Sequence, residues 1–371
     1  MHRLNASLTR PTARLLLVIA LVAGCSNGSS SGDAAPLWPD LVLDRALPDH
    51  PAPPDQTPLD LPAQDFRFEG GGSPWHTATV GAQDLHAVTC LAAGHVFVAG
   101  DKGTLLHHAP TAPGASLVKQ AVGDSTAPEQ ADLYTVAFAD ASYGVTAGKD
   151  WRIWETRDQG ASWVVAPQCS AFVFETFHAL HLWAANAGFG AGVAINSAGA
   201  GYKYYGGYSW VCGPSLYPNE VFLDVVRQDQ LGWIVGSTGG KIYHTTNEGG
   251  TWVGYAAGTS ETLRGVAIHG SVGVAVGDKG TIVTSSDGKW WSAATSPVTV
   301  DLYGVTLFNA SDGWAVGDGG TLLRTSDGGQ SWTPQVSGVS QRLESICFTS
   351  ATNGWAVGQG GTVLHTTTGG L

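Results

Sequence analysis

The chain of 371 residues is poor in charge, because Asp, Glu, Lys and Arg make up 13 % of it, against a typical share of roughly 25 %. It also contains a single Met. This scarcity of long side chains argues against helical bundles and coiled coils. Glycine and tryptophan are abundant instead, with 51 and 14 residues. Together with frequent Val and Thr, they favour short strands joined by tight turns, so the sequence predicts an all-β fold.

Positive charge is especially scarce, with 18 basic residues against 30 acidic ones and a net charge of -12. Such a chain gains nothing from releasing counterions on a phosphate backbone, which excludes nucleic acid as a partner. No group of residues has the spacing of metal ligands. His107 and His108 are adjacent and point to opposite faces of a strand, and His178 and His181 have no companion ligand. We expect neither a metal nor a cofactor.

Residues 1–24 have the pattern of a secretory signal, with a basic start and an apolar run too short to span a membrane. The run ends in Leu21-Val22-Ala23-Gly24-Cys25, which resembles the bacterial lipobox. The resemblance implies a diacylglyceryl or palmitate anchor on Cys25, and Ser26 is the residue type that permits sorting to an outer membrane. An ordinary signal peptide with a chance cysteine is the alternative. Residues 25–72, rich in Pro, Ser and Gly, are predicted to be a disordered linker.

From residue 73 to 371 the sequence repeats itself with a period near 40 residues. Each copy contains four strand-like segments, and the second reads Gly-Trp-Ala-Val-Gly in the clearest copies. This period and content are typical of propeller blades. The sequence therefore predicts a seven-bladed β-propeller. The copies begin at Leu85, Leu133, Phe177, Leu223, Leu263, Leu302 and Leu343.

The first and last copies are complementary. The last copy stops before its outermost strand, whereas the first is preceded by an extra segment over residues 73–80. Trp75 in that segment stands where Trp332 stands relative to the blade that follows it. We therefore expect the N-terminal segment to supply the missing outer strand of the last blade and to close the ring.

A recurrent turn precedes the outermost strand, with the pattern S/T-x-D-x-G-x-S/T-W. It resembles the Asp-box of the BNR-repeat superfamily, and with the Gly-Trp-Ala-Val-Gly strand it resembles the photosystem II assembly and stability factor propellers. The Asp carboxylate accepts backbone N–H groups of the turn, so we interpret it as structural. The residues at this position are Asp158, Asn247, Asp287 and Asp327. The resemblance implies a propeller scaffold that assists a membrane-protein complex.

One repeat position is polar or aromatic in every copy and directly follows the opening apolar residue. Strand alternation points it away from the apolar face, at one mouth of the central channel. We interpret this ring as the candidate binding site; the alternative is that it merely hydrates the entrance. Its members are His86, Tyr134, His178, Asp224, Arg264, Tyr303 and Glu344.

Four cysteines remain besides Cys25. Cys169 and Cys212 occupy corresponding stretches of adjacent blades, so a disulfide between them is plausible. Cys90 and Cys347 lie on the innermost strands of the first and last blades, which are neighbours in a closed ring. Their repeat positions are offset by one residue, so we expect them to face opposite ways and to remain buried free thiols.

Two functions fit these features. The first is a non-catalytic, monomeric envelope lipoprotein, at the outer membrane or the periplasmic face, whose propeller binds a protein partner or membrane complex. The second is a sialidase-type glycosidase, which needs three arginines, a Tyr–Glu pair and an acidic residue. Residues of these types near the mouth are Arg227, Arg264, Arg342, Tyr303, Glu344 and Asp224. The first blade lacks the arginine that sialidases place there, so we predict that the protein is not an enzyme.

Overall fold

The computed structural model describes residues 74–110, 117–120, 122, 131–149, 153–166, 176–185, 189–196, 200–205, 211–215, 220–237 and 239–371. All of them belong to one compact unit, Pro36–Leu371. The predicted signal peptide, the linker and Cys25 lie outside the described residues, as does the predicted Cys169–Cys212 disulfide. No helix in the described part of the chain has the length and apolarity needed to cross a membrane.

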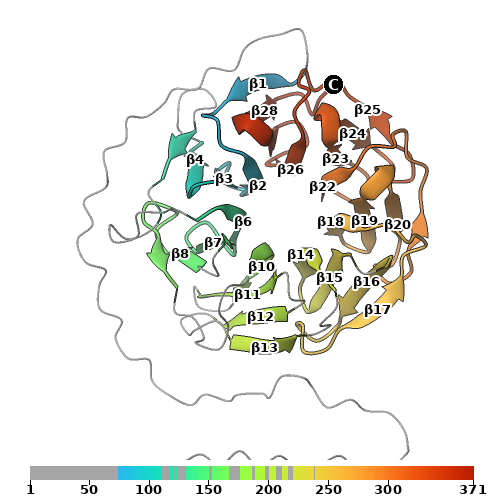
Figure 1. Ribbon diagram of the computed structural model, residues 1–371, viewed down its shortest axis with the longest axis horizontal. Coiled ribbons are helices and arrows are strands. Elements are labelled where there is room, and N and C mark those ends of the chain that lie inside the picture. Colours follow the sequence, from blue (N-terminus) through green and yellow to red (C-terminus); the bar gives the residue numbers. More distant parts are fainter. Residues whose placement is uncertain are drawn as a thin grey trace, which may run out of the picture. The chain divides into compact units, whose positions relative to one another are not determined.

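The strands of the described residues form seven four-stranded antiparallel sheets, which confirms the all-β propeller class. The innermost strand of each sheet contacts that of the next, and β26 contacts β2, so the sheets form a closed ring (Figure 1). Six of these blades, not all seven, are complete within one repeat, each made of four consecutive strands.

The first three blades have the following strands. Blade one contains β2 (Leu85–Cys90), β3 (Val96–Gly100), β4 (Thr104–His108) and β5 (Val118–Lys119). Blade two contains β6 (Leu133–Phe138), β7 (Gly144–Gly148), β8 (Ile153–Thr156) and β9 (Val164–Val165). Blade three contains β10 (Phe177–Ala185), β11 (Phe189–Asn196), β12 (Ala200–Tyr205) and β13 (Val211–Ser215).

The next three blades follow the same order. Blade four contains β14 (Phe222–Gln228), β15 (Leu231–Gly236), β16 (Lys241–Thr245) and β17 (Val253–Ala256). Blade five contains β18 (Leu263–His269), β19 (Val272–Gly277), β20 (Ile282–Ser285) and β21 (Ser292–Ala293). Blade six contains β22 (Leu302–Leu307), β23 (Gly313–Gly317), β24 (Leu322–Thr325) and β25 (Thr333–Pro334). Single 3₁₀ turns follow the second strands of the last three blades at Asp278–Gly280, Asp318–Gly320 and Gln359–Gly361.

The seventh blade is assembled from both ends of the propeller. It combines β26 (Leu343–Phe348), β27 (Gly354–Gly358) and β28 (Thr362–Thr366) with β1 (His76–Thr79). His76 pairs with His365 across this closure. Just before β1, the Trp75 ring is 1 % exposed, and the Thr366 hydroxyl donates to the Pro74 carbonyl at 2.7 Å. The extra N-terminal segment therefore supplies the outer strand of the last blade, as the sequence predicts.

The core lies between the blades rather than inside any one of them. Buried residues form one apolar cluster at each of the seven blade–blade contacts in the described residues. The second strand of blade six shows how one blade contributes to two of these clusters, because β23 is buried on both faces. Trp314 and Val316 pack toward blade seven, whereas Ala315 packs toward blade five. A strand buried on both faces needs apolar residues at successive positions, which is what the Gly-Trp-Ala-Val-Gly segment provides.

The four predicted Asp-box residues make local hydrogen bonds in their turns. The Asp327 carboxylate accepts the Ser331 backbone N–H at 2.9 Å, and the Thr325 hydroxyl donates to it at 2.8 Å. Asn247 and Asp287 accept equivalent turn N–H groups. Hydrogen bonds from Ser162 and Thr156 hold the pKa of Asp158 below its usual value, against the opposing effect of burial.

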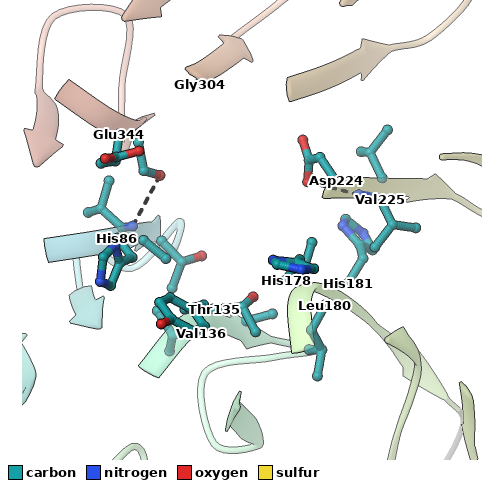
Figure 2. Close-up of a pocket in the computed structure, with 18 of the residues that line it drawn as sticks. His86, Thr135, Val136, His178, Leu180, His181, Asp224, Val225, Gly304 and Glu344 are labelled. Carbon is teal, nitrogen blue, oxygen red and sulfur yellow. Dashed lines mark hydrogen bonds between the residues drawn. The ribbon is translucent and has the colours of Figure 1, made fainter. Parts of the chain in front are cut away.

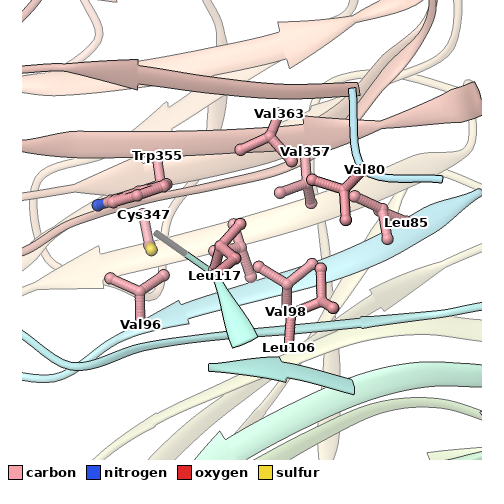
Figure 3. Packing of buried hydrophobic residues seen from close by; sticks show 11 residues of the cluster. Val80, Leu85, Val96, Val98, Leu106, Leu117, Cys347, Trp355, Val357 and Val363 are labelled. Carbon is pink, nitrogen blue, oxygen red and sulfur yellow. The ribbon is translucent and has the colours of Figure 1, made fainter. Parts of the chain in front are cut away.

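The expectation of free thiols at Cys90 and Cys347 is wrong, because these residues form a disulfide with their Cα atoms 5.6 Å apart. In a ring of blades, one face of each sheet packs on the opposite face of the next. Cys90 shares a face with Val96, and Cys347 with Trp355, and these two faces meet in one cluster (Figure 3). Side chains on opposite faces of their own strands therefore point toward each other across the contact.

Candidate functional site

The innermost strand of every blade contains a β-bulge directly after its first residue. In β2 the pairing with β3 shifts between Leu85 and Ala87, which leaves His86 as the extra residue. The same shift occurs in β6, β10, β14, β18, β22 and β26. A bulge re-aims the side chain of its extra residue. This irregularity, and not simple alternation, turns the predicted ring toward the channel.

The pairing shows that the predicted register of blade four is wrong by one residue. Phe222, and not Leu223, pairs with Gly236 and is fully buried, as Leu85 is opposite Gly100 in blade one. The bulge residue of this blade is therefore Leu223. Asp224 stands one step further along the strand and lies deeper in the channel. Two successive apolar residues made the sequence ambiguous at this point.

All seven predicted site residues line one cavity of about 320 Å³ at the ring centre. His86, Tyr134, His178, Arg264, Tyr303 and Glu344 occupy the bulge positions. Figure 2 shows His178, His181 and Asp224 together on one side of the cavity, across from His86 and Glu344. The seven residues selected from the sequence therefore do lie together, although Asp224 follows the bulge position instead of occupying it.

Blades one to three contribute an aromatic arc to the mouth. The rings of His86 and Tyr134 meet edge to face with their centroids 4.8 Å apart, and Tyr134 stacks on His178 at 6.5 Å. His86 Nε2 lies 2.7 Å from the Asp101 carboxylate. Burial lowers the pKa of His178, which favours the neutral form of this imidazole.

Blades five to seven contribute a cationic stack. The Arg264 and Arg342 guanidiniums lie over the Tyr303 ring, 4.8 Å and 4.3 Å from its centroid. Arg342 Nε donates to Asp318 at 2.6 Å, and Arg264 Nε donates to Asp278. Contacts of this kind hold long side chains in fixed positions.

The predicted binding ring omitted Arg342, which the sequence placed near the mouth only for the glycosidase alternative, and sequence reasoning missed the carboxylates that orient the mouth. Arg342 precedes the opening Leu343, outside the repeat position that we selected. Asp101, Asp278 and Asp318 directly follow the last Gly of the second strand in three blades, and each contacts a mouth residue or Arg342. The recurring Gly-Asp pair after that strand was the available signal.

Of the three arginines that a sialidase-type clamp requires, Arg227 lies apart from Arg264 and Arg342 in this structure. Arg227 is 5 % exposed and donates to the Asp229 carbonyl at the far end of β14. Arg264 and Arg342 are each engaged by an aspartate of the scaffold. Burial raises the pKa of Tyr303, against the effect of the two arginines, whereas a nucleophilic Tyr needs a lowered value. Among the described residues, no group of three or more His, Cys, Asp or Glu could hold a metal ion.

These features define the class: a β-propeller whose central mouth presents a varied set of polar and aromatic side chains. Residues 283–371 match the family model described as photosynthesis system II assembly factor YCF48, which confirms the resemblance over this stretch. No curated protein matches the chain.

Solved structures with the same fold include two YCF48 propellers. "YCF48 bound to D1 peptide" has 21 % identity and a TM-score of 0.66, covering 82 % of this chain and 100 % of that one. "YCF48 from Cyanidioschyzon merolae" has 16 % identity and a TM-score of 0.62, with 82 % and 98 % covered. A GH74 enzyme from Niastella koreensis is more distant, with 14 % identity, a TM-score of 0.58, and 78 % and 43 % covered.

Proposed function

We propose that this protein is a non-catalytic scaffold that binds a protein partner at the propeller mouth. The observation that carries the proposal is the bulge position itself, because every blade turns one side chain into the same cavity. Blade packing needs the apolar residue before the bulge but does not need His, Tyr, Arg or Glu within it. A set of different side chains suits one asymmetric partner better than a symmetric channel lining.

The comparisons support the choice of a protein as the partner. One structure with this fold is a YCF48 propeller bound to a D1 peptide, so the architecture can hold a peptide. By analogy, we propose that this chain assists the assembly of a membrane-protein complex. We do not extend the analogy to a photosystem, because the propeller has few arginines and the family is associated with an Arg-rich face. The arginines of the propeller are Arg152, Arg157, Arg227, Arg264, Arg324 and Arg342.

The cellular location is also a proposal. The lipobox-like segment ending at Cys25 and the following linker support a lipid-anchored protein at the bacterial envelope, on the outer membrane or the periplasmic face. Multiple acyl chains anchor a protein stably without any membrane-spanning helix. The anchor places the propeller next to the membrane complexes that it would assist.

Site-specific photocrosslinking in envelope membranes tests the binding site. A benzophenone side chain at exposed Lys279, beside the mouth, should capture a discrete partner. The same group at exposed Ser271, at the opposite end of blade five, is the matched control and should capture roughly tenfold less. Adding Arg264→Ala and Tyr303→Ala should abolish capture from position 279 while lowering stability by no more than about 2 kcal/mol, the cost of the lost ion pair and ring stacking. Equal capture from both ends, or capture unaffected by the double substitution, would place the site elsewhere.

A further inference from the structure

The layer of the channel just below the mouth is lined by small residues and one carboxylate. Directly after each bulge residue, six blades carry a residue no larger than Thr, and blade four carries Asp224. The six small residues are Ala87, Thr135, Ala179, Gly265, Gly304 and Ser345. Small side chains leave space along the axis, and they leave Asp224 as the one charge at this level.

Asp224 is held firmly by the backbone of two blades. Its oxygens accept the Val225 N–H and, across the blade contact, the Val266 N–H, both at 2.8 Å. Ser345 makes the equivalent contact between blades seven and one, where its hydroxyl accepts the Val88 N–H at 3.2 Å. A neutral hydroxyl therefore serves the same structural purpose. Inter-blade hydrogen bonding does not explain why blade four carries a charge.

None of the described cations is paired with Asp224. Arg264 of blade five is engaged by Asp278 and stacks on Tyr303. Arg227, which lies on β14 with Asp224, donates to the Asp229 carbonyl. Burial raises the pKa of Asp224 to about 7, although its two backbone hydrogen bonds oppose the shift. A buried carboxylate gains more interaction free energy from pairing with a cation than an exposed carboxylate does, because the low dielectric strengthens the attraction.

The groups that face Asp224 from blade three are neutral acceptors. Burial lowers the pKa of His178, and burial with the charge of Arg227 lowers the pKa of His181 to about 4. Both imidazoles line the same side of the cavity as Asp224 (Figure 2). A neutral imidazole offers one acceptor nitrogen, and an ammonium group carries three donors. One carboxylate and two imidazoles therefore match a primary ammonium.

We infer that the cavity receives the primary ammonium of a lysine side chain, which passes the mouth and binds the Asp224 carboxylate. The slim alkyl stem of a lysine fits between the small residues of the channel. Its compact ammonium charge needs no bidentate acceptor, whereas the planar guanidinium of arginine suits one. The net charge of -12 complements a basic partner. The inference rests on the proposed function, because it assumes that this lysine belongs to the bound protein partner.

Calorimetric titration of the full chain in detergent with small probes tests the site. At pH 8, n-butylammonium should bind at least about tenfold more tightly than neutral 1-pentanol, as expected when a buried charge is paired. Its affinity should fall several-fold between pH 8 and pH 6, because Asp224, with a pKa of about 7, becomes protonated over this range, whereas His181, with a pKa of about 4, stays neutral. N-acetyl-lysine methylamide should bind more tightly than glycine methylamide, whose ammonium lies on the backbone; the reverse order would overturn the assignment to a lysine side chain.

Two variants separate binding from structure. Asp224→Asn should weaken n-butylammonium binding at least about tenfold. Asp229→Asn removes an exposed charge of the same blade, outside the cavity, and should stay within about twofold of the wild type. Equal binding of the charged and neutral probes, an unaffected Asp224→Asn variant, or an equal loss in Asp229→Asn would overturn the inference. Probe failure with intact crosslinking at position 279 would leave the proposed function standing.

Discussion

The disulfide between Cys90 and Cys347 should contribute a large share of the stability of the closed ring. It joins residues 257 positions apart, so it removes the entropy of a very long loop from the unfolded chain. The chain-entropy relation gives about 5.5 kcal/mol for a loop of this length, and measured losses for native disulfides range up to about 5 kcal/mol. Replacing both cysteines by Ala should therefore lower the free energy of unfolding by about 3–5 kcal/mol.

Urea denaturation followed by tryptophan fluorescence measures this loss, since the midpoint should fall by about 1–2 M for a protein of this size. Each single variant, Cys90→Ala or Cys347→Ala, should lose nearly as much as the double variant, because either removes the same bond. Reductant should destabilise the wild type more than the double variant. Additive losses in the two single variants, or a wild type insensitive to reductant, would refute the reasoning.

Three further predictions concern the closure, acid stability and the anchor. Deleting residues 26–70 should leave the melting temperature nearly unchanged, whereas deleting 26–82 removes β1 and the buried Trp75 and should cause aggregation; equal melting of the two truncations would contradict the closure. Burial, followed by the charges of His108 and His76, lowers the pKa of His365 to about 4, below its unfolded value of about 6.5, so its contribution to stability is present above pH 6.5 and is lost as the pH falls toward 4. Denaturation curves across that window should show a smaller pH dependence for His365→Gln than for the wild type. Metabolic labelling with an alkyne-palmitate should tag the wild type but not Cys25→Ser, and equal labelling would contradict lipidation.

The sequence predicted the features that each repeat encodes by itself. The Asp-box turns, the Gly-Trp-Ala-Val-Gly strands and the bulge residues recur in place, so one copy could be read against another. Blade four escaped this comparison, because Phe222 and Leu223 are both apolar and either could open the strand. Burial decided between them, since Phe222 is fully buried.

Features that depend on two blades were harder to predict. The cysteine pairing requires the knowledge that adjacent sheets present opposite faces to each other, which the alternation of a single strand does not reveal. The stack of Arg264, Tyr303 and Arg342 joins residues from three blades and from two different repeat positions. Nothing in the spacing of one repeat indicates that such residues meet.

The pairing of β1 with β28 also sets the order in which the blades can complete their sheets during synthesis. Residues 76–79 are made well before their partners at 362–365, because almost the whole propeller lies between them in the sequence. Six blades can therefore complete their sheets as their own strands are synthesised, whereas the seventh must wait until β28 has been made. Until then β1 has no partner strand. The pairing of β1 with β28, and the oxidation of Cys90 with Cys347, must both follow the synthesis of this last part of the propeller.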